Sequence, residues 1–122
     1  MPIIDVLLVF GTDEQDSSGL AQRMADAIGE AMVASPNRVW VRLKTLPSVN
    51  YAENASVLAK GELPVFVTVL HATPPIGTEL MTEVPKLTSA VAQAADREVE
   101  RVHIEYAPPG AGRISFGGKL DE

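Results

Sequence analysis

Pro2 is the residue whose type and position most directly suggest chemistry. It follows Met1, and removal of that methionine would leave the Pro2 nitrogen as a free secondary amine. The mostly apolar run Ile3 to Phe10 predicts a buried strand that ends at Gly11. Burial lowers the pKa of an amine, and an amine that is neutral near pH 7 can act as a general base. Alternatively, Pro2 only begins a strand, where its missing N–H is harmless.

A basic stretch offers a second chemical function. Arg38, Arg42 and Lys44 alternate with apolar residues, so we expect them to share one face of a second strand. Arginine presents a planar pair of donors that fits a carboxylate, and such a face could bind an anionic substrate. The alternative is a solvated strand face in a chain with a net charge of −6.

Two histidines lie in predicted strands. The spacing of His71 and His103 does not suggest a metal site, and for each a hydrogen-bonded structural role is favoured over a catalytic one. Glu105 and Tyr106 could act as acid or water-positioning groups, although a structural role is the simpler interpretation. The sequence predicts neither a metal nor a cofactor.

Length and composition limit the class of protein. With 122 residues, 46% of them hydrophobic and 21% charged, the chain is expected to form one soluble globular domain over residues 1–122. The negative net charge argues against nucleic acid as a partner. The absence of cysteine rules out disulfides and suits a reducing cytoplasm, which is the expected location. No apolar run approaches the length that spans a bilayer, so no membrane partner is expected.

The periodicity of apolar residues in the first half predicts a strand, a helix and a second strand. A capping box at Thr12 to Gln15 would begin the helix, which would end near Ser35 and Pro36. A second strand is predicted from Arg38 to Lys44, where the period falls to two. The helical stripe has a spacing of four residues and consists of Leu20, Met24, Ile28 and Met32.

The same order returns in the second half. A strand is predicted from Pro64 to His71, a helix follows, and Arg101 to Tyr106 alternate as a last strand. Pro85 would either kink this helix or mark a late start. Its apolar stripe consists of Leu80, Val84, Leu87, Val91 and Ala95.

Both halves open on a proline, which indicates a tandem duplication with repeats at 2–53 and 64–120. A β-α-β crossover favours parallel pairing of its two strands. The sequence therefore predicts two tandem β-α-β units within one domain.

Several segments in this order resemble the tautomerase superfamily. They are Pro2-Ile3-Ile4, Asp13-Glu14-Gln15, the strand from Val39 to Leu43, and the tail Ser115-Phe116-Gly117-Gly118-Lys119-Leu120. That superfamily includes 4-oxalocrotonate tautomerase, macrophage migration inhibitory factor, the chloroacrylate dehalogenases and malonate semialdehyde decarboxylase. The resemblance implies an α+β fold, in which the two β-α-β units form a four-stranded sheet with two helices on one face. It also implies a trimer around an inner barrel of sheets, in which the C-terminal hairpin reaches a neighbouring subunit.

The resemblance also suggests roles for individual residues. Pro2 matches the catalytic proline, which acts first as a base and then as an acid. Trp40 stands where the family carries a carboxylate-binding arginine, and Arg38 and Arg42 lie two residues to either side. Arg42 is the first candidate for the clamp, and Arg38 is the alternative. Tyr51 falls where the family often has an aromatic wall, and Phe116 is its looser counterpart in the second unit.

The sequence departs from the family pattern in two places. Thr12 stands where the tautomerases often carry an arginine after the first strand. His71-Ala72-Thr73-Pro74 stands where the decarboxylases and dehalogenases carry arginines after the third strand. Plain enol–keto tautomerisation requires less machinery than dehalogenation or decarboxylation and is the favoured hypothesis.

The resulting hypothesis is a cofactor-independent tautomerase or isomerase of small enol or 2-keto carboxylic acids. Pro2 would move the proton, Arg42 or Arg38 would bind the carboxylate, and Trp40, Tyr51 and Phe116 would exclude water. The alternatives are a non-catalytic trimeric binding protein of the same fold and a decarboxylase- or dehalogenase-type relative. Retention of Met1 would leave Pro2 as an amide and favour the binding protein.

A homotrimer is also expected from the strands themselves. A sheet with helices on one face leaves the other face bare. Two sets of strand residues are apolar, Ile4-Val6-Leu8 and Val65-Val67-Val69. At least one of these sets is expected to need a partner surface, which a closed cyclic assembly would supply.

Overall fold

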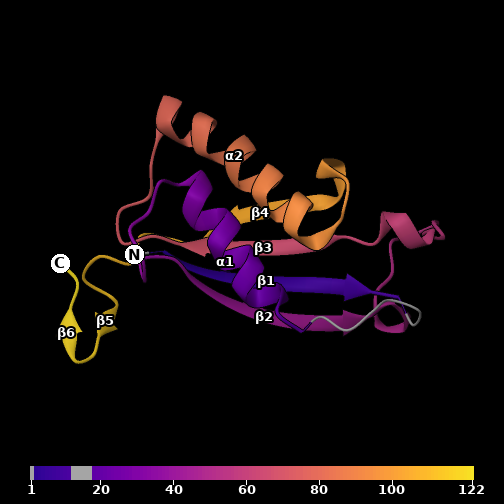
Figure 1. Ribbon diagram of the computed structural model, residues 1–122, viewed down its shortest axis with the longest axis horizontal. Helices are drawn as coiled ribbons and strands as arrows, with labels where there is room; N and C mark the ends of the chain where they lie inside the picture. Colours follow the sequence, from indigo (N-terminus) through magenta and orange to yellow (C-terminus); the bar gives the residue numbers. More distant parts are fainter. Residues whose placement is uncertain (1, 12–17) are drawn as a thin grey trace.

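The computed structural model describes residues 2–11 and 18–122, which form two successive β-α-β units (Figure 1). The first unit consists of β1 (Ile3–Phe10), α1 (Leu20–Ala31) and β2 (Trp40–Pro47). The second consists of β3 (Val65–Leu70), α2 (Gly77–Ala95) and β4 (Val102–Tyr106). The capping box predicted at residues 12–15 lies outside the described residues.

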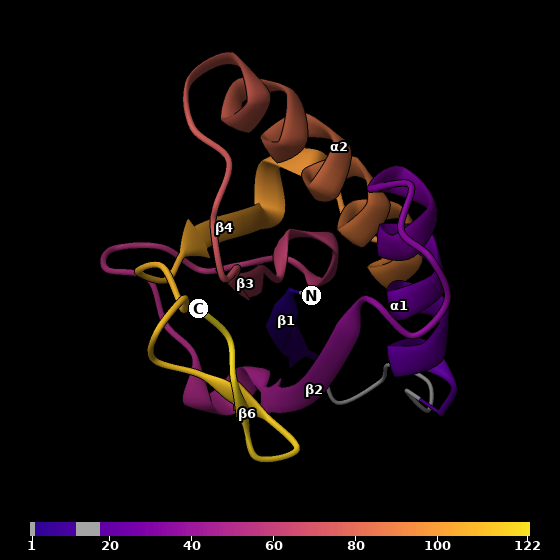
Figure 2. The same cartoon turned by 90° about the vertical axis from the view of Figure 1, so that its left-hand side faces the viewer.

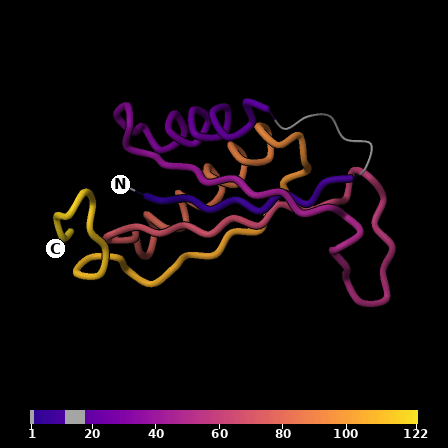
Figure 3. The backbone as a smooth tube through the Cα atoms, turned by 90° about the horizontal axis from the view of Figure 1, so that it is seen from below, coloured from indigo at the N-terminus to yellow at the C-terminus, as the bar shows by residue number. Residues whose placement is uncertain are grey.

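The four strands form one mixed sheet in the order β2-β1-β3-β4, and Figure 3 shows them side by side in that order. β1 pairs with β2 in parallel, and β3 pairs with β4 in parallel, as expected for strands joined by a helical crossover. The two central strands, β1 and β3, are antiparallel, with Val6 opposite Val67. Both helices lie on the same side of the sheet (Figure 2). The predicted fold class is therefore confirmed, while the repeat boundaries 2–53 and 64–120 stay a prediction.

The core lies between the helices and one face of the sheet. Alternate residues of the two central strands point into it, because successive side chains of a strand face opposite ways. α1 contributes its predicted stripe and α2 the later part of its own. The fully or almost fully buried side chains are Ile4, Val6, Leu8, Leu20, Met24, Ile28, Val65, Val67, Val69, Leu87 and Val91.

Pro85 was expected either to kink the second helix or to mark a late start of that helix, and the structure rules out the late start. The helix begins at Gly77 and runs through Pro85, so Pro85 is an interior residue and the late helix start was wrong. A proline there gives up one backbone hydrogen bond. The helix continues because Leu87, Val91 and Ala95 beyond it are buried against the sheet.

The apolar strand residues expected to need a partner surface are covered by the helices, so that expectation was wrong. Ile4, Val6 and Leu8 of β1, like the matching valines of β3, face the helices and need no further cover. The open face of the sheet carries the intervening residues instead, which are a mixture of apolar and polar side chains. Among them are Asp5, Leu7, Trp40, Arg42, Lys44, Phe66, Thr68, His103 and Glu105.

A small hairpin ends the chain at the same end of the sheet as Pro2 (Figures 1 and 2). Its strands are β5 (Ser115–Phe116) and β6 (Lys119–Leu120). Gly117 and Gly118 join them with φ angles of 60° and 88°, a left-handed conformation that favours glycine in a two-residue hairpin turn. Three single-turn 3₁₀ helices, Ser48–Asn50, Lys60–Glu62 and Val99–Arg101, connect the larger elements. Among the described helices, none combines the length and the apolar character that crossing a membrane would need.

Candidate active site

A cavity of about 710 Å³ lies at the end of the sheet where β1 begins and β3 ends. The end of α1 and the segment after it supply an apolar wall, which consists of Ala31, Met32, Val33, Ala34 and Val39. α2 supplies a polar wall between Thr78 and Lys86. Pro2 and His71 lie between these walls at the ends of the two central strands.

Pro2 faces the cavity because of its place directly before β1. Ile4 and Val6 point toward the helices, and Pro2 has the same parity along the strand. Its carbonyl accepts a hydrogen bond from the Trp40 N–H at 3.2 Å, which extends the β1–β2 ladder by one position. The proline ring is therefore fixed at the start of a paired strand and remains partly exposed toward the cavity.

His71 lies next to Pro2 through strand register. Leu70 and Ile3 are the last pair of the antiparallel β1–β3 ladder, and His71 and Pro2 are the residues directly beyond that pair. Opposed side chains on one face of such a pair have Cβ atoms about 4.5–5.5 Å apart. Both residues line the cavity, so the fold brings together two side chains that lie far apart in the sequence.

Glu83 holds the His71 ring in the cavity wall. His71 Nε2 lies 3.2 Å from Glu83 Oε2, and the Tyr106 hydroxyl donates to the same oxygen at 2.7 Å. The side chains of His71 and Glu83 are 14% and 16% exposed, so bulk water competes little for these bonds. The rings of His71 and Tyr106 are nearly parallel, with an angle of 9° and centroids 6.1 Å apart.

Tyr106 is a donor that does not ionise easily. Burial raises the pKa of its phenol, and the hydrogen bond and charge of Glu83 raise that pKa further. The tyrosine therefore stays neutral through the physiological range and continues to donate to Glu83.

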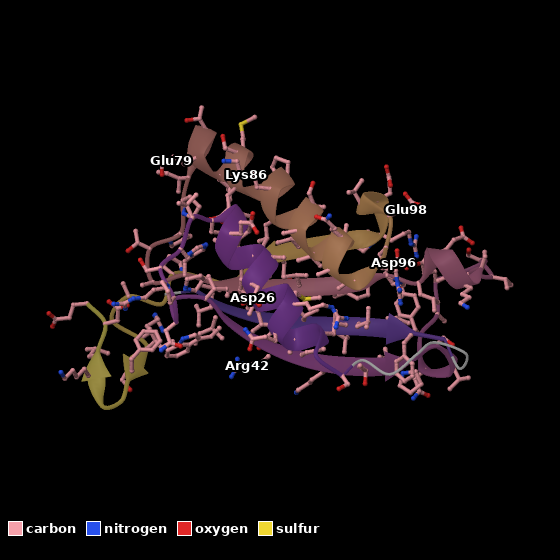
Figure 4. The ribbon with its side chains drawn as sticks, in the orientation of Figure 1. Asp26, Arg42, Glu79, Lys86, Asp96 and Glu98 are labelled. Carbon is pink, nitrogen blue, oxygen red and sulfur yellow. The ribbon has the colours of Figure 1, made fainter. Side chains whose placement is uncertain are left out.

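Arg38 and Lys86 bring positive charge to the cavity from two sides. Arg38 comes from the segment before β2, and Lys86 from α2, on which Figure 4 labels both Glu79 and Lys86. Both cations are exposed, which leaves them accessible to an anion that enters from solvent. Within residues 2–11 and 18–122, no cluster of three or more His, Asp and Glu side chains could hold a metal ion.

Arg42 lies on the other face of the sheet. Its Nε and its second terminal nitrogen donate to the two Asp5 carboxylate oxygens at 2.6 and 2.8 Å. This hydrogen-bonded pair raises the pKa of the Arg42 guanidinium. Figure 4 shows Arg42 on the side of the sheet away from α2. Of the two arginines predicted as carboxylate clamps, the single chain therefore places Arg38, and not Arg42, beside Pro2.

Trp40 and Phe116 contact each other near the start of β2. Their ring centroids are 5.2 Å apart with an interplanar angle of 79°, and Trp40 Nε1 donates to the Asn37 carbonyl at 2.9 Å. This edge-to-face contact fixes the C-terminal hairpin against β2. Neither ring lines the cavity of the single chain, although both lie at the same end of the sheet.

Tyr51 lies at the opposite end of the sheet from Pro2. Its hydroxyl donates to Glu53 Oε2 at 2.6 Å, and Arg101 donates to the same oxygen at 2.8 Å. Its ring packs against Phe66 with centroids 5.9 Å apart. The pKa of Glu53 is lowered by the hydrogen bonds from Tyr51 and Arg101. Within one chain, Tyr51 is therefore not part of the Pro2 cavity.

The sequence reasoning missed the residues that α2 contributes. Glu79, Glu83 and Lys86 recur at spacings of four and three, which places them on one helix face beside the apolar stripe. That polar stripe was a readable signal for a functional helix face. His71 was noticed but was interpreted as structural, and the structure shows both a hydrogen bond to Glu83 and a place in the cavity wall.

Comparison with known proteins identifies the fold. No family model and no curated protein matches the sequence. Among solved structures, a fused 4-OT symmetric trimer is 13% identical, covers 98% of this chain and 94% of that chain, and has a TM-score of 0.74. A macrophage migration inhibitory factor from Oncomelania hupensis is 18% identical, covers 100% and 83% of the two chains, and has a TM-score of 0.72.

A third solved structure, FG41 malonate semialdehyde decarboxylase inhibited by 3-bromopropiolate, is 17% identical and covers 94% of this chain and 88% of that chain, with a TM-score of 0.68. These proteins are all members of the tautomerase superfamily. The chain has the tautomerase-superfamily fold, and the resemblance seen in the sequence is confirmed at the level of structure.

Both tyrosines should remain largely protonated at pH 10, where an unperturbed phenol is half ionised. The chain has two tyrosines, and burial is the main cause of the raised pKa of both Tyr51 and Tyr106. Since each folded pKa lies above the unfolded value, the stability that each contributes is complete below about pH 10 and is lost as pH rises through the folded pKa.

Tyrosinate absorbance followed against pH measures this effect. The native protein should show little absorbance at pH 10, and the urea-unfolded chain about half of its final value. Tyr51→Phe and Tyr106→Phe assign the two steps. A native midpoint equal to the unfolded one would show that the burial and hydrogen bonds described here do not persist in solution.

Proposed function

We propose that this protein is a cofactor-independent tautomerase of small enol or 2-keto carboxylic acids, with Pro2 as its general base and acid. The observation that carries this proposal is the shared cavity, in which Pro2 lies with the cations Arg38 and Lys86. A basic amine next to a carboxylate-binding cation is the minimum needed to move a proton in an anionic keto acid.

The proton transfer uses the nitrogen of Pro2 after removal of Met1. The neutral amine takes a proton from the carbon next to the substrate carbonyl, and the C–H electron pair forms a C=C bond. The carbonyl π pair then moves onto oxygen and gives an enolate. Return of the proton from the Pro2 ammonium to the same or another carbon completes the isomerisation, so Pro2 ends in its starting state.

Arg38 is proposed as the carboxylate clamp. It is exposed at the cavity mouth, whereas Arg42 is held in a two-point contact by Asp5 on the other face. Lys86 adds a second positive charge from α2, near which enolate charge can develop. The apolar wall around Met32 and Val39 limits water around the reacting carbon.

Support for a keto-acid substrate comes from one further neighbour. Pt0534, a protein described as inactivated by 2-oxo-3-pentynoate, is 15% identical, covers 98% of this chain and 94% of that chain, and has a TM-score of 0.73. A 2-oxo acid therefore inactivates at least one protein of this fold.

We also propose that the protein is a cytoplasmic homotrimer. Fused 4-OT proteins of this fold are described as trimers. The open sheet face exposes Trp40 and Phe66 to 38% and 36%, together with the paired charges of Asp5 and Arg42. A trimer would cover this mixed face and could bring Tyr51 or Phe116 of one subunit toward the cavity of another, where the sequence resemblance expects them.

Pro2→Ala should lower kcat for enol acids by roughly 10²–10⁴-fold, because general acid–base catalysis typically contributes that factor. The measurement is ketonisation of a panel that includes phenylenolpyruvate, with chains shown by intact mass to lack Met1. The fold should survive, since alanine can also begin a strand. Light scattering should give a trimer for both proteins, and a monomeric wild type would contradict the proposed assembly. Wild-type rates in Pro2→Ala would reject the proton-transfer role.

Arg38→Ala and Arg42→Ala form a matched pair. Arg38→Ala should raise KM for a carboxylate substrate about tenfold or more, since a charge-assisted hydrogen bond contributes roughly 1.5–3 kcal/mol. Arg42→Ala should leave KM unchanged if the oligomer persists, because its partner is Asp5. A raised KM in Arg42→Ala with an unchanged KM in Arg38→Ala would assign the clamp to Arg42, supplied by a neighbouring subunit. An unchanged KM in both variants would show that neither arginine binds the substrate.

A further inference from the structure

We propose that His71 is a second catalytic residue of this site and exchanges a proton with the substrate oxygen while Pro2 exchanges one with carbon. Glu83 and Tyr106 are positioning residues for its ring. This inference rests on the proposed tautomerase function and adds a residue that the sequence reasoning had set aside as structural.

The first argument is placement. Pro2 and His71 lie directly beyond the last pair of the β1–β3 ladder, Ile3 with Leu70, and both line the same cavity. A small 2-keto acid has its carbonyl oxygen and its reactive carbon only a bond or two apart. Two neighbouring groups on one wall of the cavity can therefore reach both ends of the reacting unit.

The second argument is the hydrogen bonding of the ring. Glu83 Oε2 engages Nε2 at 3.2 Å, so Nδ1 is the ring nitrogen left for a molecule in the cavity. When neutral, a ring whose Nε2–H donates to a carboxylate presents Nδ1 as an acceptor, and when protonated it presents Nδ1–H as a donor. Tyr106 donates to the same Glu83 oxygen at 2.7 Å and fixes the carboxylate in turn.

The third argument is burial. The His71 and Glu83 side chains are 14% and 16% exposed, whereas a histidine with only a surface role would remain solvated. His103, the other histidine, provides the contrast, because it is exposed on the open face of the sheet. Glu83 is hydrogen-bonded to the His71 ring, and Tyr106 stacks on that ring. The other charged or titratable groups that line the same cavity are Pro2, Arg38, Glu79 and Lys86.

The step balances without any co-reactant. In ketonisation, Nδ1 of neutral His71 takes the enol O–H proton, and the O–H electron pair forms the C=O bond. The C=C π pair takes a proton from the Pro2 ammonium, so the ketone forms, His71 gains one proton and Pro2 loses one. Water returns a proton from His71 to Pro2 before the next turnover. Pro2 and His71 together carry one exchangeable proton when the reaction starts, both in ketonisation and in its reverse.

Kinetics of His71→Gln test the proposal. Because the pair must hold one proton, kcat/KM of the wild type should fall on both sides of an optimum pH. His71→Gln keeps an amide that can bond to Glu83 but cannot exchange a proton, so kcat should fall about 100-fold or more and one limb of the profile should vanish. Glu83→Gln and Tyr106→Phe should give smaller losses and keep both limbs. Glu98→Gln, which removes an exposed carboxylate remote from the cavity, is the matched control and should match the wild type.

The outcomes separate the two proposals. If Pro2→Ala loses activity while His71→Gln keeps a normal rate and both limbs of its pH profile, the role of His71 is overturned and the role of Pro2 stands. No turnover of any panel acid by the processed wild type would overturn the tautomerase function and this inference with it.

Nitrogen NMR of the wild type supplies a test that does not depend on the folding of a variant. The chain has two histidines, so His103 serves as the internal control. Added phenylpyruvate should shift the ring signal of His71 and leave that of His103 in place. No shift of His71 at concentrations that saturate the kinetics would contradict the proposal.

Discussion

The antiparallel pairing of β1 with β3 is the contact on which this structure depends. Each β-α-β unit has a parallel strand pair and one helix, and the central pairing joins the two into a sheet with a common core. Val6 lies opposite Val67, and both side chains are buried beneath the helices. A shift of one residue in this register would turn an entire apolar set toward the open face, so the register is strongly specified.

The same register determines the composition of the cavity. With Ile3 opposite Leu70, the next pair outward is Pro2 and His71, and both face the helix side. The end of α1 and the beginning of α2 close over this pair. A core constraint therefore positions the residues proposed for proton transfer.

Strand alternation separates Arg38 and Arg42, which were both candidates for the carboxylate clamp. Arg42 lies within β2, and its side chain must face away from Val41 and Leu43, which contact the core. Arg38 precedes the strand, which begins at Trp40, so the alternation does not dictate its direction. Arg38 consequently reaches the cavity, while Arg42 is paired with Asp5 on the open face.

The periodicity of the sequence was sufficient to predict the elements and the parallel pairs, and the family resemblance supplied the position of both helices on one face. It did not show which strand face would be covered, because Ile4-Val6-Leu8 is equally suited to a subunit interface and to a helix-covered core. Pro2 and Arg38 could be selected from their types and positions. The contact of Glu83 with His71 and Tyr106 could not be predicted, since it depends on how α2 crosses the sheet.

Tyr51, Trp40 and Phe116 belong to a different kind of prediction. Their roles came from a resemblance to trimeric proteins, and the single chain places all three outside the cavity wall. An aromatic wall supplied by a neighbouring subunit depends on surfaces that meet only in an assembly, so neither the periodicity of the sequence nor the fold of one chain determines it.

The central claim is that the Pro2 nitrogen is a reactive amine inside the cavity, and mass mapping of a covalent adduct tests it most directly. The natively produced chain would be treated with the electrophilic 2-oxo acid 2-oxo-3-pentynoate, digested and analysed by mass spectrometry. The account predicts a chain that lacks Met1 and carries a single adduct on Pro2, with much slower labelling in Arg38→Ala. A chain that retains Met1, or labelling of Lys86 in place of Pro2, would contradict it.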